Sequence, residues 1–204
     1  MGTIPLLAAE RLRVTILVGN VTDPLPPGEG PIRRRTWPKA LAPGQPRVPT
    51  RAVPGEGVPD ALVAEPGFSA LVEVEAAGRR RTLLFDTGVS PDGMVENARR
   101  LGLDLRDVEA IVLSHGHRDH VAGMDGVARV LGPSRLPVVI HPDGWTRRRL
   151  AFPGLTPAEL PTPSHAALRG AGLEIVEERQ PSLVLDGALL VTGEVDRRTS
   201  FEQG

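Results

Sequence analysis

The chain has 204 residues and a formal net charge of −1, with 24 Lys and Arg against 25 Asp and Glu. This length suffices for one domain with a substantial core, and the charge balance gives no overall attraction to nucleic acid or membrane. Because the chain contains no cysteine, disulfides and thiolate metal sites are excluded, and any metal must be held by His, Asp or Glu.

The arginine runs at 33–35, 79–81 and 147–149 are dispersed, so we interpret them as solvated faces. We therefore expect a small-molecule substrate and no nucleic-acid or membrane partner. The N-terminus lacks the basic and apolar regions of a signal peptide, and no apolar run approaches the ~20 residues needed to cross a bilayer. These features predict a soluble, cytoplasmic protein.

The first predicted element is a strand at 11–18, which is rich in β-branched residues. The stretch 23–60 that follows carries many Pro and Gly residues. Because Pro removes backbone donors and breaks helices, this stretch predicts a long loop without regular elements, either functional or disordered.

Apolar runs at 69–75 and 81–86 predict a hairpin. The segment 90–102 predicts a helix with Ser90 as its N-cap and with Met94, Ala98 and Leu101 on one face. A buried strand at 110–114 and a weakly helical segment at 121–132, which contains two glycines, follow.

The C-terminal part predicts a strand at 136–141, a helix at 163–172 and strands at 173–177, 182–186 and 188–192. The last two strands meet at Asp186-Gly187, a strong hairpin signal. Strands that alternate with helices and hairpins indicate a mixed α/β (α+β) fold, and without an internal repeat we expect residues 1–204 to belong to a single domain.

The segment "SHGHRDH" (114–120) holds three of the five histidines and an aspartate, directly after a buried strand. Sites in α/β folds favour this edge of a sheet. His115 and His117 are two residues apart, so in an extended loop both imidazoles can reach one cation. Asp119 and His120 lie at the turn into the next helix and can face a second cation beside the first. Imidazole and carboxylate suit zinc, manganese and iron alike, so one or two divalent ions, with zinc first, are predicted.

This motif resembles the H-x-H-x-D-H motif of the metallo-β-lactamase-fold hydrolases, and the resemblance extends to "LLFDTG" (83–88). It implies an αββα sandwich, with His115 and His117 holding one metal and Asp119 and His120 the other. It also implies that Asp86 braces the ligand loop without being a ligand. Asp-Thr-Gly is an aspartic-protease signature as well, but that chemistry needs a second copy, which the sequence lacks.

Several blocks between 65 and 204 resemble one branch of this superfamily, the dihydropterin-(ribofuranosyl)aminobenzene phosphate synthase-like hydrolases. They include "GFSALVEVE", "VVIHPDGWTRRR" and "LLVTGEVDRRTSFEQG". The branch usually has Glu-His-Gly where this chain has Glu65-Pro66-Gly67, so the role of that histidine is lost. The branch implies a substrate with a phosphate or pterin-like part.

In the resembled family, further ligands follow the last of these blocks, so the chain matches the N-terminal portion only. His141 ends a predicted strand and is a candidate metal or substrate contact, whereas His165 is expected on the surface. Asp186 and Asp196 lie in a turn and in an Arg-flanked loop, without histidine neighbours. An unfinished sandwich would expose an apolar sheet face, which favours self-association.

The leading hypothesis is a metal-dependent hydrolase in which a metal-bound hydroxide attacks the substrate and Asp119 orients that hydroxide. The alternative is a truncated, non-catalytic metal-binding or interaction protein that carries half of the dinuclear site. A nuclease activity would need a basic surface and an added nucleic-acid domain, which we do not find in the sequence.

Overall fold

The structure is a computed structural model. It describes residues 4–21, 27–34, 36, 39, 41–53, 55, 57–195 and 197–201. Its centre is a six-stranded sheet in the order β1-β4-β5-β6-β7-β10. The strands are β1 (Ala9–Val18), β4 (Ser69–Ala76), β5 (Arg79–Phe85), β6 (Ala110–Leu113), β7 (Pro137–Ile140) and β10 (Glu174–Glu177). Neighbours from β1 to β5 are antiparallel, and those from β5 to β10 are parallel.

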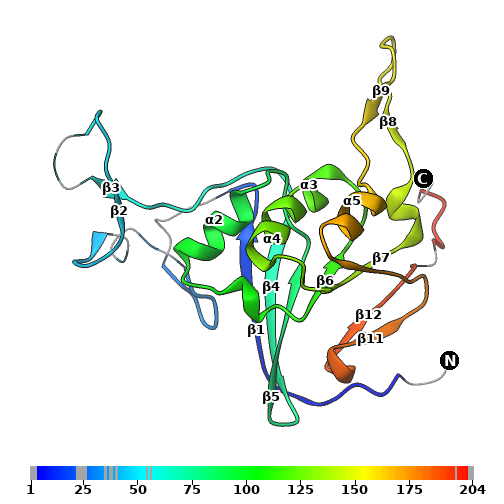
Figure 1. Cartoon of the computed structure of the whole chain (residues 1–204), viewed down its shortest axis with the longest axis horizontal. Helices are drawn as coiled ribbons and strands as arrows, with labels where there is room; N and C mark the ends of the chain where they lie inside the picture. The colour runs from blue at the N-terminus through cyan, green and yellow to red at the C-terminus, as the bar shows by residue number, and fades with distance from the viewer. Residues whose placement is uncertain are drawn as a thin grey trace.

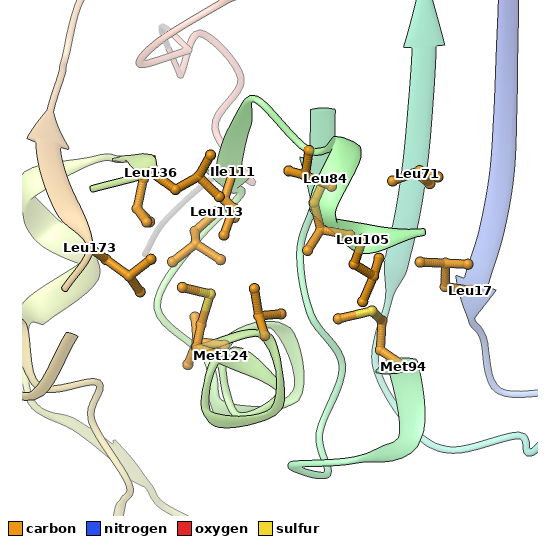
Figure 2. Close-up of a cluster of buried hydrophobic side chains, with 14 of the residues drawn as sticks. Leu17, Leu71, Leu84, Met94, Leu105, Ile111, Leu113, Met124, Leu136 and Leu173 are labelled. Atoms are coloured by element: carbon orange, nitrogen blue, oxygen red, sulfur yellow. The ribbon is translucent and has the colours of Figure 1, made fainter. Parts of the chain in front are cut away.

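Helices cover one face of this sheet (Figure 1). They are α2 (Gly93–Arg100), α3 (Arg118–Val121), α4 (Met124–Leu131) and α5 (His165–Gly170). Alternate residues of the strands point toward them, so that Ile111 and Leu113 meet Met94 and Met124 in the main core (Figure 2). Burial of these large apolar side chains drives this packing.

The opposite face carries a second, smaller layer. It consists of the antiparallel pair β11 (Ser182–Val184) and β12 (Leu189–Val191), which packs on Leu83, Val112 and Val139. The described residues thus form helix, sheet and sheet layers, three of the four layers of an αββα sandwich. The predicted mixed α/β class is confirmed, and Asp186-Gly187 lie in the turn of the predicted hairpin.

Two further pairs of short strands project from the body of the molecule (Figure 1). They are β2 (Arg47–Val48) with β3 (Val58–Pro59), and β8 (Arg148–Leu150) with β9 (Ala158–Leu160). The prediction that 23–60 contains no regular element was therefore wrong for the pair β2–β3. Two strands of two residues need few backbone hydrogen bonds, so a Pro at the end of one strand is tolerated. The predicted stretch also contains residues 23–26, 35, 37, 38, 40, 54 and 56, which lie outside the described residues.

Two helix predictions need correction. The cap of α2 is Asp92 rather than Ser90, although the Ser90 hydroxyl still accepts a hydrogen bond from the amide of Gly93 at 3.0 Å. The helix predicted at 121–132 is observed as α4, and the separate short helix α3 precedes it and includes Asp119 and His120. The break lies at Gly123, where a Cβ would approach the carbonyl oxygen of Thr87 to 2.0 Å. Only a glycine at this position allows the two backbones to approach so closely.

Of the described part of the chain, no helix is long and apolar enough to span a membrane. The arginine runs are not simply solvated faces, because Arg81 is buried and pairs with Glu109 at 2.9 Å and with Asp186. Arg148 is half-buried, and its guanidinium donates to backbone carbonyls. These two arginines therefore support the structure.

Candidate metal centre

The histidine motif lies where β6 ends and α3 begins, at the carboxyl edge of the parallel strands. The extended backbone at His117 gives way to the helix at Arg118, which separates the motif into two pairs. The first pair is His115 and His117 in the loop, and the second pair is Asp119 and His120 in the first turn of α3. The fold thus brings all four predicted residues to one edge of the sheet.

The two imidazoles of the first pair face each other. Nε2 of His115 lies 3.0 Å from Nδ1 of His117, and the ring centres are 4.7 Å apart. Nδ1 of His115 lies 2.9 Å from the hydroxyl of Ser114. Partial burial is the main reason that the pKa of His115 lies below its usual value, and the neighbouring His120 and His117 lower it further. The imidazole of His115 is therefore kept in the neutral form, which is the form that binds metals.

The second pair lies beside the first. The rings of His115 and His120 have their centres 4.2 Å apart, and Nε2 of His120 is 3.6 Å from a carboxylate oxygen of Asp119. Nδ1 of His120 lies 2.8 Å from Oδ2 of Asp86 and donates to it. In the neutral tautomer that donates from Nδ1, the lone pair of Nε2 lies on the side of Asp119 and the histidine cluster.

Asp86 connects the sheet to this motif. Its carboxylate is buried and also accepts hydrogen bonds from the amide and the hydroxyl of Ser114, both at 2.7 Å. Its backbone has a φ of +54°, a conformation that Asp and Asn tolerate better than most residues. The amide of Thr87, the next residue, donates to the carbonyl of His120 at 2.8 Å. One carboxylate thus contacts both ends of the motif.

A close backbone contact supports the other side of the loop. A Cβ on Gly116 would lie 1.8 Å from the carbonyl oxygen of Gly144, so only glycine allows this approach. Arg148 spans the contact, because its Nη1 donates to the carbonyls of Gly144 at 3.2 Å and Thr146 at 3.0 Å and lies 3.5 Å from the carbonyl of Gly116. The first pair is therefore held through the backbone.

The other candidates lie apart from the cluster. His141 has its Nε2 3.3 Å from Arg179 and 3.4 Å from Glu194, and it makes no hydrogen bond with the three histidines. His165 is half-buried and stacks edge-on against Trp145 instead of lying freely on the surface. Asp186 pairs with Arg79 and Arg81, and Asp196 lies outside the described residues.

A cavity of about 440 Å³ opens beside the motif, on the sheet face that carries β11 and β12. Ser114, His141, Glu178 and Thr192 supply its polar wall, and its other wall is apolar, with Phe85, Val112, Val139 and Val191 among its residues. The cavity links Ser114, which contacts His115, with the predicted substrate contact His141. Sequence reasoning did not find Glu178 or Thr192, since neither belongs to a motif.

The side chains of the motif provide nitrogen and oxygen donors for a metal ion. Among the residues that the structure describes, no group of three or more His, Asp and Glu side chains is arranged to hold one ion. The separation of 3.0 Å between two nitrogens of the first pair is near the ~3.3 Å between two ligands of one tetrahedral zinc. The spacing of the first pair therefore suits two ligands of one ion, and in the second pair Nε2 of His120 and the Asp119 carboxylate are 3.6 Å apart.

Comparison with known proteins identifies relatives of this chain. It is 32% identical over 77 residues to a 7,8-dihydropterin-6-methyl-4-(beta-D-ribofuranosyl)-aminobenzene-5'-phosphate synthase of Methanocaldococcus jannaschii, which covers 38% of this chain and 26% of the relative. It is also 32% identical over 113 residues to a ribonuclease Z of Salinibacter ruber, covering 53% of this chain and 33% of the relative. The chain thus spans about a quarter to a third of the length of these curated relatives.

A subclass B3 metallo-beta-lactamase from a soil metagenome library is a structural neighbour, with a TM-score of 0.34 and 21% identity over 56% of this chain and 42% of that one. The family model of the metallo-beta-lactamase superfamily matches residues 62–193, which is more than half of the chain and includes the whole histidine motif. The predicted family is confirmed, and a relative named for the predicted branch is among the matches. The chain belongs to the metallo-beta-lactamase superfamily.

Proposed function

We propose that this protein is a metal-dependent hydrolase whose metal centre is built on the two pairs of the histidine motif. The observation that carries this proposal is the arrangement of Asp86, His115 and His120 at the carboxyl edge of the sheet. In metal sites, a carboxylate commonly accepts a hydrogen bond from the ring nitrogen of a histidine that does not bind the metal. This bond fixes the tautomer and raises the basicity of the ligand nitrogen.

In this proposal, the first pair holds one divalent ion through Nε2 of His115 and Nδ1 of His117. The second pair holds another through the carboxylate of Asp119 and Nε2 of His120. Zinc is the first choice, and manganese or iron also suits these donors. A bound divalent ion lowers the pKa of a water ligand toward ~7 and so supplies a nucleophile at neutral pH.

The protein's own residues would orient and confine the substrate. Asp119 could accept a proton or a hydrogen bond at the reacting water, since its carboxylate lies at the open side of the cluster. The cavity beside Ser114 is the proposed substrate space, because a volume of about 440 Å³ suits a small molecule. The similarity to a phosphate synthase and to ribonucleases Z supports a phosphate-bearing substrate, and a nucleic-acid substrate stays an alternative to the expected small molecule.

A second candidate function is metal binding without turnover. It is favoured by the observation that the described residues offer two ligands, not three, at each position. Such a protein would bind an ion weakly or complete its site with ligands from another chain. The two candidates differ in the number of ions bound and in turnover.

Ion counting separates the two candidates. Metal-free protein would be titrated with zinc, manganese or iron, the bound ions counted per chain, and a generic phosphodiester and a lactone assayed afterwards. The hydrolase proposal predicts two ions and turnover, with one ion lost in His115→Ala and in His120→Ala. His165→Ala is the matched control, since it removes a histidine outside the cluster. Less than one weakly bound ion, without turnover, would rule out hydrolysis by this chain and support the second candidate.

A further inference from the structure

The first strand of the main sheet has a free edge. β1 pairs with β4 from Ala9 to Val18, and it is the last strand in the order of the sheet. In the described part of the chain, no strand pairs with its outer side. Because an edge strand presents unpaired backbone donors and acceptors, it is a ready template for a further strand.

This edge strand also exposes an apolar stripe. Leu12, Val14 and Ile16 alternate along β1 and are 61%, 53% and 52% exposed, whereas Leu17 and Val18 at its end are buried. Alternate residues of a strand share one face of the sheet, so the three side chains form a continuous row. Such a row is matched by another strand with apolar residues at every second position.

A cleft of about 1070 Å³ runs along the same strand. Its described walls come from residues 12–16 of β1, from residues 31–34, 39, 42, 45 and 62, and from Arg100 at the end of α2 with the two residues that follow it. The described lining residues include five cationic side chains and neither Asp nor Glu; the cations are Arg13, Arg33, Arg34, Lys39 and Arg100. In a chain with a net charge of −1, a cleft of this composition is a local concentration of positive charge.

Three of these cations have no carboxylate partner among the described residues. Within the residues that the structure describes, no carboxylate lies within 4.0 Å of Arg33, Arg34 or Lys39. The other arginine runs differ, since Arg79–Arg81 and Arg147 with Arg149 all have acidic partners. Their charge is therefore available to a ligand.

We propose that this cleft binds an extended acidic peptide segment of a partner protein, which adds to β1 as a further strand. Its apolar side chains would alternate with Asp or Glu, so that one set covers Leu12, Val14 and Ile16 and the other set meets the cations of the cleft. The main-chain bonds supply affinity, and the alternation selects the partner.

The lining favours a peptide over a single-stranded nucleic acid. Single-stranded RNA and DNA are usually held by aromatic side chains on which bases stack, and none of the described residues that line this cleft is aromatic. The free strand edge and the alternating apolar row match the two-residue repeat of an extended polypeptide.

The test uses a fluorescent peptide of about ten residues in which Val and Glu alternate, matched to the length of β1. Binding to the full chain would be followed by fluorescence anisotropy. We expect the double variant Arg33→Glu with Arg34→Glu to bind at least about tenfold more weakly. The double variant Arg147→Glu with Arg149→Glu, which has the same charge change on the β8–β9 hairpin, should bind as the unchanged protein does.

Peptide controls separate strand pairing from simple charge attraction. A peptide of the same composition with its Val and Glu residues in separate blocks should bind much more weakly. Two further peptides carry N-methyl groups on alternate residues, one on the odd-numbered residues and the other on the even-numbered residues. Only one of the two should lose binding, because only one set of amides would face β1 and form hydrogen bonds with it. Equal binding of all these peptides, no binding of any, or tighter binding of a single-stranded RNA of equal charge would overturn the proposal.

Discussion

The two pairs of the candidate metal centre are held in place by different means. The second pair depends on a buried side chain, because Asp86 accepts from His120 and from Ser114. The first pair depends on backbone packing, because Gly116 lies against Gly144 and Arg148 spans the two segments. The difference implies that each half of the site can be disturbed separately, and four predictions use this separation.

The largest effect is expected for Asp86→Ala. This change leaves the amide of Ser114 and Nδ1 of His120 without their buried acceptor, and it should lower the free energy of unfolding by about 3 kcal/mol or more. Metal affinity at the second pair should fall by about tenfold or more, and it should fall less at the first pair, which Asp86 reaches only through Ser114. Chemical unfolding of the metal-free protein and ion counting would measure both effects.

Two comparisons control this prediction. Asp86→Asn tolerates the φ of +54° and keeps an acceptor oxygen, so it should lose less stability than the Ala variant. Asp125→Ala removes an exposed carboxylate on α4 and should change little. If Asp86→Ala behaved like Asp125→Ala, the carboxylate would not be what orients the second pair.

The next effect is expected for Gly116→Ala. The added Cβ would lie 1.8 Å from the carbonyl oxygen of Gly144, so the loop must shift, at a cost of about 1–3 kcal/mol. The ion at the first pair should be lost in preference to the ion at the second. Gly170→Ala is the control, because nothing lies within 4 Å of a Cβ at that position. Equal melting temperatures and ion counts in the two variants would contradict the predicted contact.

A smaller effect is expected for Arg148→Met. Methionine keeps much of the aliphatic stem but removes the donors to the carbonyls of Gly144 and Thr146, which should cost about 1–2 kcal/mol. Zinc affinity at the first pair should decrease, since the loop loses its connection to residues 142–146. Arg147→Met, which removes an exposed arginine paired with Glu159, should leave zinc affinity unchanged. A decrease of similar size in both variants would show that loss of positive charge explains the result.

The smallest effect is a dependence of stability on pH. The pKa of His115 is lowered in the folded protein, chiefly by burial, so below pH 6.5 the unfolded chain binds more protons than the folded one. The free energy of unfolding of the metal-free protein should therefore fall as the pH decreases from 6.5 toward the folded pKa. His115→Gln should reduce this slope, whereas His165→Gln should not. An unchanged slope in His115→Gln would place the titrating group elsewhere.

Much of the core and the location of the motif could be predicted because they depend on local patterns. The apolar runs at 69–75, 81–86 and 110–114 became neighbouring strands, and the histidines followed the last of them. The hairpin β8–β9 was missed, since its exposed residues show no apolar alternation. The role of Arg148 was also missed, because its acceptors are backbone carbonyls that no sequence motif marks.

The sequence by itself determined the family, the α/β class and the four side chains proposed as ligands, because these depend on residue types at short spacings. Only the tertiary structure decided which groups support each pair. Asp86 reaches His120 across 34 positions, and Gly116 meets Gly144 across 28, because parallel strands bring distant loops to one edge of the sheet. The same holds for charge, since the fold brings acidic partners near Arg79 and Arg147, whereas Arg33 and Arg34 have none among the described residues.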